Sequence, residues 1–322
     1  MNAIGVDVGG TKIAGAVVSP EGKILNEVRY PTQAVPPNRL IESIARAILE
    51  VKDGFEVGGV CVAVPGLILA AENKVIFAPN LHEIENIRLD EEIGGRTGLS
   101  VTVENDANAA AWGEFRYGAG RDVDHQVFIT LGTGVGGGVI THGVLLRGAQ
   151  GAGGELGHVT LDPTGPRCGC GNHGCLEALA SGTAIRRRAR EVASDQPGSA
   201  LGRLAIEREV LGEDVTRLAQ EGDEASISVL EETGRWLGIG LAGFVNIFNP
   251  EVIPVGGGAS RAGELILGPA REEVQLRARS PSRDLVEIKE ATLGPESGVL
   301  GAAGLSRGAD GEYVLGPSKR VA

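Results

Sequence analysis

The sequence predicts an α/β protein that is built from two similar halves. Short apolar runs alternate with segments whose apolar residues recur every three or four positions, a pattern typical of strands followed by amphipathic helices. From Ile4 to Leu25 a strand, a glycine turn, a second strand, another turn and a third strand follow one another, and this layout returns at 127–146. A repeated layout indicates internal duplication. A length of 322 residues leaves room for two domains.

The composition excludes some classes of function. The formal net charge is −12, which argues against a nucleic-acid surface, because such surfaces gather Lys and Arg. The basic run Arg186–Arg188 falls in a predicted helix, where we interpret it as a solvated face. The sequence has no secretory signal pattern at its start and no apolar run long enough to span a bilayer. We therefore expect a cytoplasmic protein with neither a nucleic-acid nor a membrane partner, and reduced cysteines suit that compartment.

In the first half, three predicted strands precede a helix, and further strands precede a second helix, with turns rich in Gly and Pro between these elements. The segments are strands 3–8, 13–18 and 23–30, a helix at 40–49, strands 59–65, 75–78 and 101–104, and a helix at 107–117.

In the second half, three predicted strands precede a region of helices. The segments are strands 127–131, 139–141 and 144–146, helices 183–191, 201–211 and 225–248, a strand at 252–255, a helix at 263–279, a strand at 286–288 and a final helix at 297–305. The tail after Gly308 is polar and rich in turn residues, so we expect it to be weakly ordered.

One stretch of the second half concentrates metal-binding residue types. His158 is followed by Cys168, Cys170 and Cys175, with glycines between the cysteines. Three thiolates and one imidazole complete a tetrahedral zinc site, and a site closed by four protein ligands is structural rather than catalytic. A disulfide would leave one cysteine of the cluster with only the distant Cys61 as a partner, and unligated core cysteines are the other alternative. The spacing favours a structural zinc ion.

A glycine-rich turn follows the first strand of the second half. Gly132, Gly134 and Gly137 match G-x-G-x-x-G, but the chain continues as a strand, whereas a dinucleotide-binding fold requires a helix there. A Walker P-loop is absent from the sequence. The Rossmann interpretation therefore fails on its context.

The two glycine turns can instead bind phosphate groups. Backbone N–H groups in such turns form anion-binding nests, and Thr hydroxyls and a Lys ammonium add to them. Asp7 precedes the first turn and is suited to a hydrated Mg2+ ion. Ordinary hairpin turns are the alternative for either turn alone. The candidate phosphate-binding residues are Gly9, Gly10, Thr11 and Lys12 in the first turn and Gly132, Thr133 and Gly134 in the second.

A third glycine run follows the strand at 252–255. Gly256 and Gly257 could let a base or a ribose lie flat against the backbone. A simple turn from a strand into a helix would have the same composition. The run is a candidate for the adenosine site.

Asp106 is the candidate general base. It lies where the strand at 101–104 ends and a helix begins, and ligands of α/β sheets gather at the carboxyl ends of strands. A carboxylate in this place can take the proton of an attacking hydroxyl in phosphoryl transfer. The alternative is that Asp106 only caps the helix. Asn80, Asn105 and Asn108 add amide groups that can both donate to and accept from sugar hydroxyls.

Taken together, these motifs resemble the ROK family of sugar kinases and repressors, and within it the glucokinases. The residues that carry the resemblance are Asp7–Lys12 (DVGGTK), Glu104–Asn108 (ENDAN), Leu131–Gly138 (LGTGVGGG), Gly154–His158 (GELGH), the cysteine set 168–175 and Glu177.

The resemblance implies two RNase H-like lobes of the actin and hexokinase type, with ATP and a sugar in the cleft between them. It implies a first lobe at 1–120, joined by the returning segment 294–322, and a second lobe at 121–293. It also implies ATP-dependent phosphorylation of a hexose at its 6-hydroxyl, Mg2+ as cofactor and a homodimer or homotetramer. By the same resemblance Asp106 is the catalytic base, and the sugar contacts are Asn80, Asn105, Asp106, Glu155, His158 and Glu177.

The sugar is expected to be glucose, with alternatives left open. His173 between the cysteines resembles some N-acetylglucosamine kinases, where a glucokinase more often has Arg. Glucosamine, mannose and N-acetylmannosamine stay open, as does polyphosphate in place of ATP. The repressors of the family carry a DNA-binding segment before the first phosphate turn, and here that turn begins at Gly9, so we expect an enzyme. A sugar-sensing regulator without catalytic activity is the alternative from another class.

Overall fold

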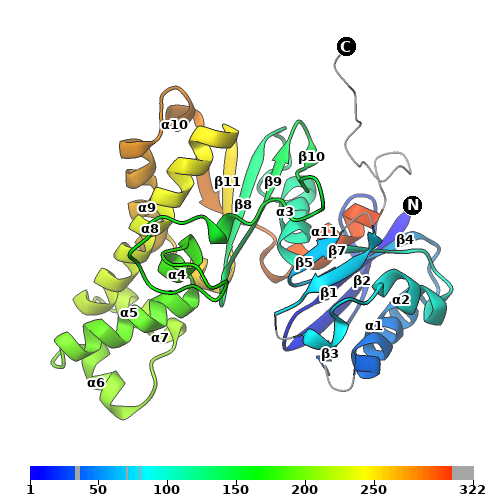
Figure 1. Ribbon diagram of the computed structural model, residues 1–322, viewed down its shortest axis with the longest axis horizontal. Coiled ribbons are helices and arrows are strands. Elements are labelled where there is room, and N and C mark those ends of the chain that lie inside the picture. The colour runs from blue at the N-terminus through cyan, green and yellow to red at the C-terminus, as the bar shows by residue number, and fades with distance from the viewer. Residues whose placement is uncertain (33–36, 70–71, 80, 307–322) are drawn as a thin grey trace. The chain divides into compact units, whose positions relative to one another are not determined.

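The computed structural model describes residues 1–32, 37–69, 72–79 and 81–306, which form two compact units (Figure 1). Unit 1 comprises Met1–Asp124, Gly138–Gly154 and the C-terminal stretch from Leu293, and unit 2 comprises His125–Gly137 and Glu155–Thr292. Asn80 and the tail after Gly308, for which the sequence makes predictions, lie outside the described residues.

Unit 1 contains eight complete strands and four α-helices among its described residues. They are β1 (Asn2–Val8), β2 (Lys12–Val18), β3 (Ile24–Pro31), α1 (Pro37–Lys52), β4 (Val57–Val64), β5 (Leu67–Leu69), β6 (Lys74–Phe77), α2 (Leu89–Thr97), β7 (Val101–Asn105), α3 (Asp106–Tyr117), β10 (Val144–Leu145) and α11 (Ser297–Ser306).

Unit 2 is mainly helical. Its elements are β8 (Gln126–Leu131), α4 (Leu176–Ala180), α5 (Gly182–Asp195), α6 (Ala200–Glu207), α7 (Gly212–Gln220), α8 (Glu224–Phe248), β11 (Val252–Gly256), α9 (Glu264–Arg277), α10 (Ser282–Leu285) and β12 (Glu287–Glu290). The division between the units passes through β9 (Val135–Thr141).

Two five-stranded sheets have the same order of strands. The first is β3-β2-β1-β4-β7 and the second is β10-β9-β8-β11-β12. In the first, β2 pairs antiparallel with β1 and β3, while β4 pairs parallel with β1 and β7. In the second, β9 and β10 are antiparallel, and β11 is parallel to β8 and β12. The repeated layout in the sequence therefore corresponds to a repeated sheet topology.

The pleat of β1 decides which residues of unit 1 reach its functional edge. Ile4, Val6 and Val8 share one hydrophobic cluster with residues of α1 and α2, so they face that side of the sheet. Alternate residues point to the opposite face. There a side chain at Gly5 would approach the backbone of α11 within 2.0 Å, and Asp7 follows on the same face. The alternation therefore directs Asp7 towards α11.

Several short elements have no signal in the sequence. Only two residues of α2 that are four positions apart, Leu89 and Ile93, are buried, and two glycines interrupt the helix. Helix α4 has five residues and α10 has four, too few for a periodic pattern. Tertiary contacts rather than local pattern stabilise these elements.

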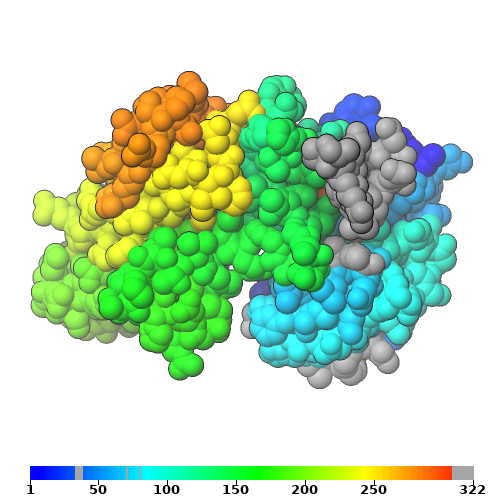
Figure 2. Space-filling view, turned by 45° about the horizontal axis from the view of Figure 1, so that its top comes forward, coloured from blue at the N-terminus to red at the C-terminus, as the bar shows by residue number. Residues whose placement is uncertain are grey.

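Helix α8 is the centre of unit 2, where it contacts α4, α5, α7 and α9. It packs closely on α9, because side chains at Gly234 and Gly238 would meet carbonyl oxygens of α9 within 2.4 Å. Figure 1 shows α8, which runs from yellow-green to yellow, beside α9, and in Figure 2 the surface of this helical region runs from yellow-green to orange. None of the helices in the described part of the chain is long and apolar enough to cross a membrane.

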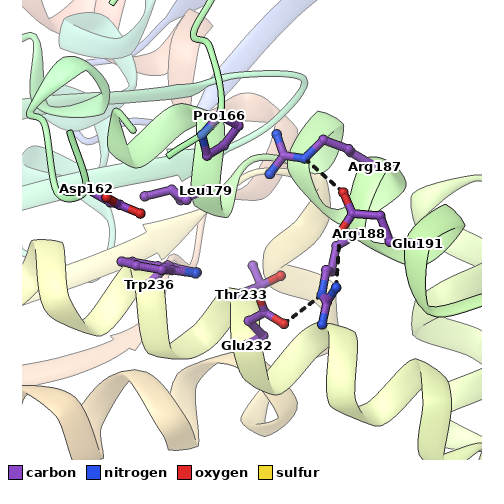
Figure 3. Close-up of a pocket in the computed structure, with 9 residues that line it drawn as sticks. All are labelled: Asp162, Pro166, Leu179, Arg187, Arg188, Glu191, Glu232, Thr233 and Trp236. Atoms are coloured by element: carbon purple, nitrogen blue, oxygen red, sulfur yellow. Dashed lines mark hydrogen bonds and ion pairs between the residues drawn. The ribbon is translucent and has the colours of Figure 1, made fainter. Parts of the chain in front are cut away.

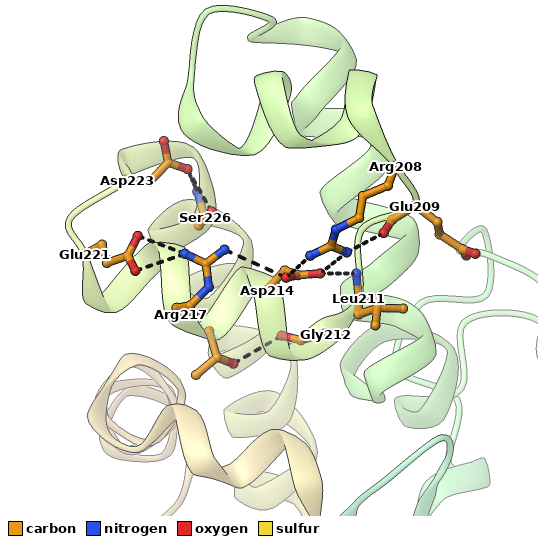
Figure 4. Close-up of polar contacts among 10 residues, drawn as sticks. Arg208, Glu209, Leu211, Gly212, Asp214, Arg217, Glu221, Asp223 and Ser226 are labelled. Atoms are coloured by element: carbon orange, nitrogen blue, oxygen red, sulfur yellow. Dashed lines mark hydrogen bonds and ion pairs between the residues drawn. The ribbon is translucent and has the colours of Figure 1, made fainter.

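A buried carboxylate caps α7 (Figure 4). Asp214 accepts two hydrogen bonds from the Arg208 guanidinium, at 2.6 and 2.8 Å, and one from the backbone N–H of Leu211 at 3.0 Å. These bonds favour the ionised carboxylate and hold the pKa of Asp214 below its usual value of 3.8. The bonds from Arg208 have the larger effect, and the bond from the Leu211 N–H adds to it. The side chain of Asp214 is only 11% exposed. This residue therefore fixes the start of α7.

We expect Asp214→Asn to lower the free energy of unfolding by about 1 kcal/mol near neutral pH, because the carboxylate cap is weakened and its ion pair is screened by solvent. Because its pKa is lower in the folded protein, the ionised Asp214 stabilises the fold at pH values above the unfolded-state pKa of 3.8. This stabilisation is lost as the pH falls through the folded-state pKa. The melting temperatures of the two proteins should therefore differ near neutral pH and converge once the pH falls below the folded-state pKa of Asp214. Asp195→Asn, at an exposed helix end, is the matched control. An unchanged melting temperature for Asp214→Asn at pH 7 would contradict the assignment.

Candidate functional site

The first glycine turn lies at the carboxyl end of β1 in unit 1. The backbone N–H of Gly9 donates to the Lys12 carbonyl at 2.8 Å, and the Thr32 hydroxyl donates to the Gly9 carbonyl at 2.6 Å. Gly10 and Thr11 are exposed, and a side chain on Gly10 would meet no atom within 4 Å apart from those of Gly10 and its two chain neighbours. The turn is thus anchored at its base and open at its tip, as an anion-binding turn requires.

Asp7 and Asp106 lie at the same edge of the first sheet. Strands β1, β4 and β7 run parallel, so their carboxyl ends share that edge, with Asp7 beside Ala63 and Ala63 beside Glu104. Burial raises the pKa of Asp7 to about 6, the negative charge of Asp106 adds to the increase, and Lys12 opposes it. The two carboxylates are therefore close enough to interact.

This raised pKa has a consequence for stability. Because the pKa of Asp7 is higher in the folded protein, its protonated carboxyl group stabilises the fold at pH values below the unfolded-state pKa of 3.8. This stabilisation is lost as the pH rises through about 6. In buffer without divalent cations, Asp7→Asn should therefore be more stable than wild type at pH 8, by on the order of 2 kcal/mol. The difference should disappear near pH 4. Thermal unfolding across this pH range measures it, and a variant less stable than wild type at pH 8 would contradict the interpretation.

Asp106 is the first residue of α3, and it does not cap this helix. The N-cap is Asn105, whose side-chain oxygen accepts the backbone N–H of Asn108 at 3.0 Å. The capping interpretation of Asp106 is therefore wrong. The Asp106 carboxylate accepts the N–H of Ala107 at 2.9 Å and is partly exposed, at the positive end of the helix dipole.

A buried ion pair holds the start of α3 in place. Glu104 is 2% exposed and pairs with Arg147 through an Nε–Oε2 distance of 2.7 Å. Its other oxygen accepts from the Asn105 N–H at 3.0 Å and the Asn108 side-chain amide at 3.1 Å. Breaking a buried pair of this kind leaves an uncompensated charge and is strongly destabilising. Sequence reasoning missed Arg147, because nothing near position 147 signals a partner more than forty residues away.

The four predicted metal ligands come together in unit 2. The donor atoms of His158, Cys168, Cys170 and Cys175 all lie within 4.8 Å of one another. The Cys170 and Cys175 sulfurs are 3.8 Å apart, and the Cys168 sulfur is 3.6 Å from His158 Nδ1. Zinc bonds of about 2.0–2.3 Å place neighbouring donors of a tetrahedron roughly 3.5–3.8 Å apart. The donor set and its spacing therefore fit a tetrahedral zinc ion, with Nδ1 as the imidazole ligand.

The other nitrogen of His158 faces a second predicted sugar contact. Nε2 lies 3.9 Å from Glu155 Oε2, and the Glu155 side chain is exposed. A metal on Nδ1 would fix the orientation of the ring and so the direction of Nε2. His158 and Glu155 are thus brought together as a polar pair with accessible donor and acceptor atoms.

Glu177 lies against the second glycine turn. Its Oε2 accepts the backbone N–H of Val135 at 3.2 Å, and its Oε1 lies 3.3 Å from the Cys168 sulfur. Thr133 at the tip of this turn is exposed, and the chain continues directly into β9. The strand that follows confirms that the glycine pattern is not a dinucleotide-binding motif.

The third glycine run has a packing role. Gly257 has a φ of 89°, and a side chain on it would come within 2.5 Å of the Leu131 backbone. Gly256 ends β11, and a side chain there would touch Phe128 and Ala291. Packing by itself accounts for both glycines, and their role towards adenosine stays a prediction.

A cavity of about 260 Å3 lies elsewhere in unit 2, between Pro166, α5 and α8 (Figure 3). Its two guanidinium groups already face carboxylates, with Arg188 at 2.7 Å from Glu232 and 3.0 Å from Glu191, and Arg187 at 3.8 Å from Glu191. Carboxylates outnumber guanidiniums among its lining residues. The cavity therefore lacks the free positive charge that a phosphate needs.

Comparisons with known proteins agree with these motifs. The chain is 43% identical to a glucokinase of Thermotoga maritima over 307 residues, which cover 95% of this chain and 97% of that protein. The structure of a ROK family glucokinase from Streptomyces griseus, in complex with glucose and AMPPNP, matches with a TM-score of 0.83 and 38% identity, over 95% of this chain and 99% of that one.

A repressor is also similar to this chain. The xylose repressor of Bacillus subtilis is 31% identical over 308 residues, which cover 94% of this chain and 76% of the repressor. The model of the ROK family matches residues 3–309. The architecture of two repeated sheets agrees with that of the structural relatives, and the chain belongs to the ROK family.

Proposed function

We propose that this protein is a sugar kinase that transfers the γ-phosphoryl group of ATP to the 6-hydroxyl of a hexose, with glucose as the preferred substrate. The observation that carries the proposal is the pair Asp7 and Asp106 at one sheet edge, where the charge of one raises the pKa of the other. Phosphoryl transfer needs one carboxylate for a metal ion and another for the attacking hydroxyl. The similarity to glucokinases supports glucose as the acceptor.

In the proposed reaction Asp106 accepts the proton of the sugar hydroxyl. As this oxygen bonds to the γ-phosphorus, the bond from phosphorus to the bridging oxygen of ADP breaks, and ADP leaves with that electron pair. The backbone N–H groups of the two glycine turns bind the phosphate oxygens, and the Lys12 ammonium offsets their charge. The predicted phosphate contacts at Gly9, Gly10, Thr11, Gly132, Thr133 and Gly134 are part of this proposal.

Asp7 is the residue that would hold Mg2+. Its carboxyl group has a raised pKa because burial and a second carboxylate disfavour its charge, and a cation would relieve both. When bound, Mg2+ would neutralise charge on the phosphates. Because the pKa of Asp7 is about 6, we propose that activity at low Mg2+ declines as pH falls through that value.

The sugar contacts are proposed to come from Asn105, Asp106, Glu155, His158 and Glu177, with Asn80 as a further candidate. Amide, carboxylate and imidazole groups supply the mixture of donors and acceptors that hydroxyls need. The zinc ion is structural in this proposal, because all four of its positions are taken by protein ligands. Its role is to hold the loop that carries Glu155 and His158.

We further propose a cytoplasmic homodimer or homotetramer, with lobes at 1–120 plus 294–322 and at 121–293. A metal site with three cysteines requires reduced thiols, which favours the cytoplasm.

The test is a coupled assay of ADP release with ATP and Mg2+ over glucose, N-acetylglucosamine, N-acetylmannosamine, mannose and glucosamine. We expect the highest kcat/KM with glucose. Preference for N-acetylglucosamine would leave the mechanism intact and change the sugar, and activity with polyphosphate alone would change the donor. Folded, zinc-loaded protein that binds sugar but turns over none of them would favour a sugar-sensing regulator and overturn the enzyme proposal.

A further inference from the structure

The segment after the cysteine cluster is bonded to the second glycine turn at three points. The Glu177 carboxylate accepts the N–H of Val135 at 3.2 Å. The N–H of Gly182 donates to the Gly132 carbonyl at 2.8 Å, and the Thr183 hydroxyl donates to the Thr133 carbonyl at 2.8 Å. All of these residues belong to unit 2.

This segment is short and begins at a candidate metal ligand. Cys175 is fully buried and is the N-cap of the five-residue helix α4. The C-cap of α4 is Ser181, which is also the N-cap of α5, where its hydroxyl accepts the N–H of Ala184 at 3.1 Å. Only six residues therefore lie between the candidate metal ligand Cys175 and Gly182, and five of them form α4.

The contact between this segment and the turn is also tight. A side chain on Gly134 would come within 2.2 Å of Glu177 Oε2, and a side chain on Gly182 would come within 2.8 Å of the Gly132 oxygen. The space between this segment and the turn is thus too small even for a methyl group. A movement of α4 or of the start of α5 towards the turn would therefore displace the turn.

The bonded carbonyls determine where the N–H groups of the turn point. In a planar trans peptide the C=O and the following N–H point in opposite directions. The bond from Gly182 to the Gly132 carbonyl thus directs the N–H of Thr133 away from α5. The bond from Thr183 to the Thr133 carbonyl does the same for the N–H of Gly134. Both N–H groups become available to an anion.

We propose that Thr183, together with Gly182 and Glu177, positions the second glycine turn for the nucleotide phosphates, and that these contacts link the metal cluster to nucleotide affinity. This inference rests on the proposed kinase function. The cysteine cluster would then influence the affinity for ATP as well as the binding of the sugar.

The principal test is Thr183→Val, which removes the hydroxyl donor and keeps the shape of the side chain. We expect the Kd of a non-hydrolysable ATP analogue, measured by calorimetry with Mg2+, to rise about fivefold, the usual net effect of one hydrogen bond. KM for the hexose and the melting temperature should stay unchanged, and Thr183→Ser should restore nucleotide affinity. Thr216→Val, which also removes a hydroxyl bonded to a backbone carbonyl, is the matched control on α7.

A second variant tests the same contact through shape. Gly182 is the first residue of α5, where Ala is compatible with the helix, so Gly182→Ala should fold normally. Its methyl group should nevertheless push the Gly132 carbonyl and weaken binding of the ATP analogue. A wild-type Kd in both Thr183→Val and Gly182→Ala would overturn the positioning role.

The link to the metal is tested by removing zinc with a chelator. We expect the Kd of the ATP analogue to rise in the wild type and to rise by a smaller factor in Thr183→Val, because the variant has already lost part of the coupling. Equal factors in both proteins would refute the link. Wild-type protein that neither binds the nucleotide nor phosphorylates a hexose would refute the proposed function and this inference with it, whereas an active wild type beside an unaffected Thr183→Val refutes this inference alone.

Discussion

Asp106→Asn is expected to reduce kcat by about 10²- to 10⁴-fold, the range that a positioned general base contributes. The amide cannot accept the proton of the sugar hydroxyl, yet it retains the size and polarity of the carboxylate. Because Asn105 rather than Asp106 caps α3, the variant should keep the stability of the helix. KM for the sugar should change little, and initial rates with saturating ATP measure both constants.

Two further measurements make this result specific. Asp122→Asn, at an exposed position of the same unit, controls for the loss of one negative charge and should keep wild-type turnover. The Asp106→Asn variant should also titrate Asp7 at a lower pKa, since the charge of Asp106 contributes to the raised value. If Asp106→Asn kept near-normal turnover, Asp106 would not be the base.

Loss of the metal is expected to have the second large effect. Cys175→Ser should bind much less than one zinc ion per chain and lose about 10- to 100-fold in kcat/KM, the range seen when even outer partners of a metal ligand are removed. Cys175 is completely buried and is the N-cap of α4, so its loss should disturb both the loop that carries Glu155 and His158 and the segment bonded to the second glycine turn. Zinc content by elemental analysis and kinetics on the same preparation measure the effect.

Cys61→Ala provides the control for cysteine chemistry. Cys61 is buried in β4, and burial raises the pKa of its thiol to about 12, so it stays protonated. Within the described part of the chain it is not a member of the candidate metal-ligand group. This variant should keep its zinc and its turnover. Full activity of zinc-free Cys175→Ser would show that the metal is dispensable, and the proposed structural role would be abandoned.

Local sequence signals were sufficient for the elements whose pattern is strong. The hairpin around Gly9–Lys12 and the helix that begins near Asp106 were predicted, because alternating apolar residues and glycine turns act over a few positions. The cysteine cluster was predicted from spacing alone, since the chemistry of zinc requires a fixed set of donors. Short elements such as α2 and α10 were not, because too few of their residues are buried in a periodic pattern.

By itself, then, the sequence determined the repeated strand layout, the candidate metal ligands and the candidate base. Only the tertiary structure decided that Asn105 caps α3, that Arg147 neutralises the buried Glu104, and that Thr183 is bonded to Thr133. Each of these contacts depends on where distant segments or competing side chains come to lie. A motif shows which groups are present, whereas the partner of each polar group is settled by packing, because a buried donor or acceptor must find its partner wherever the fold supplies one.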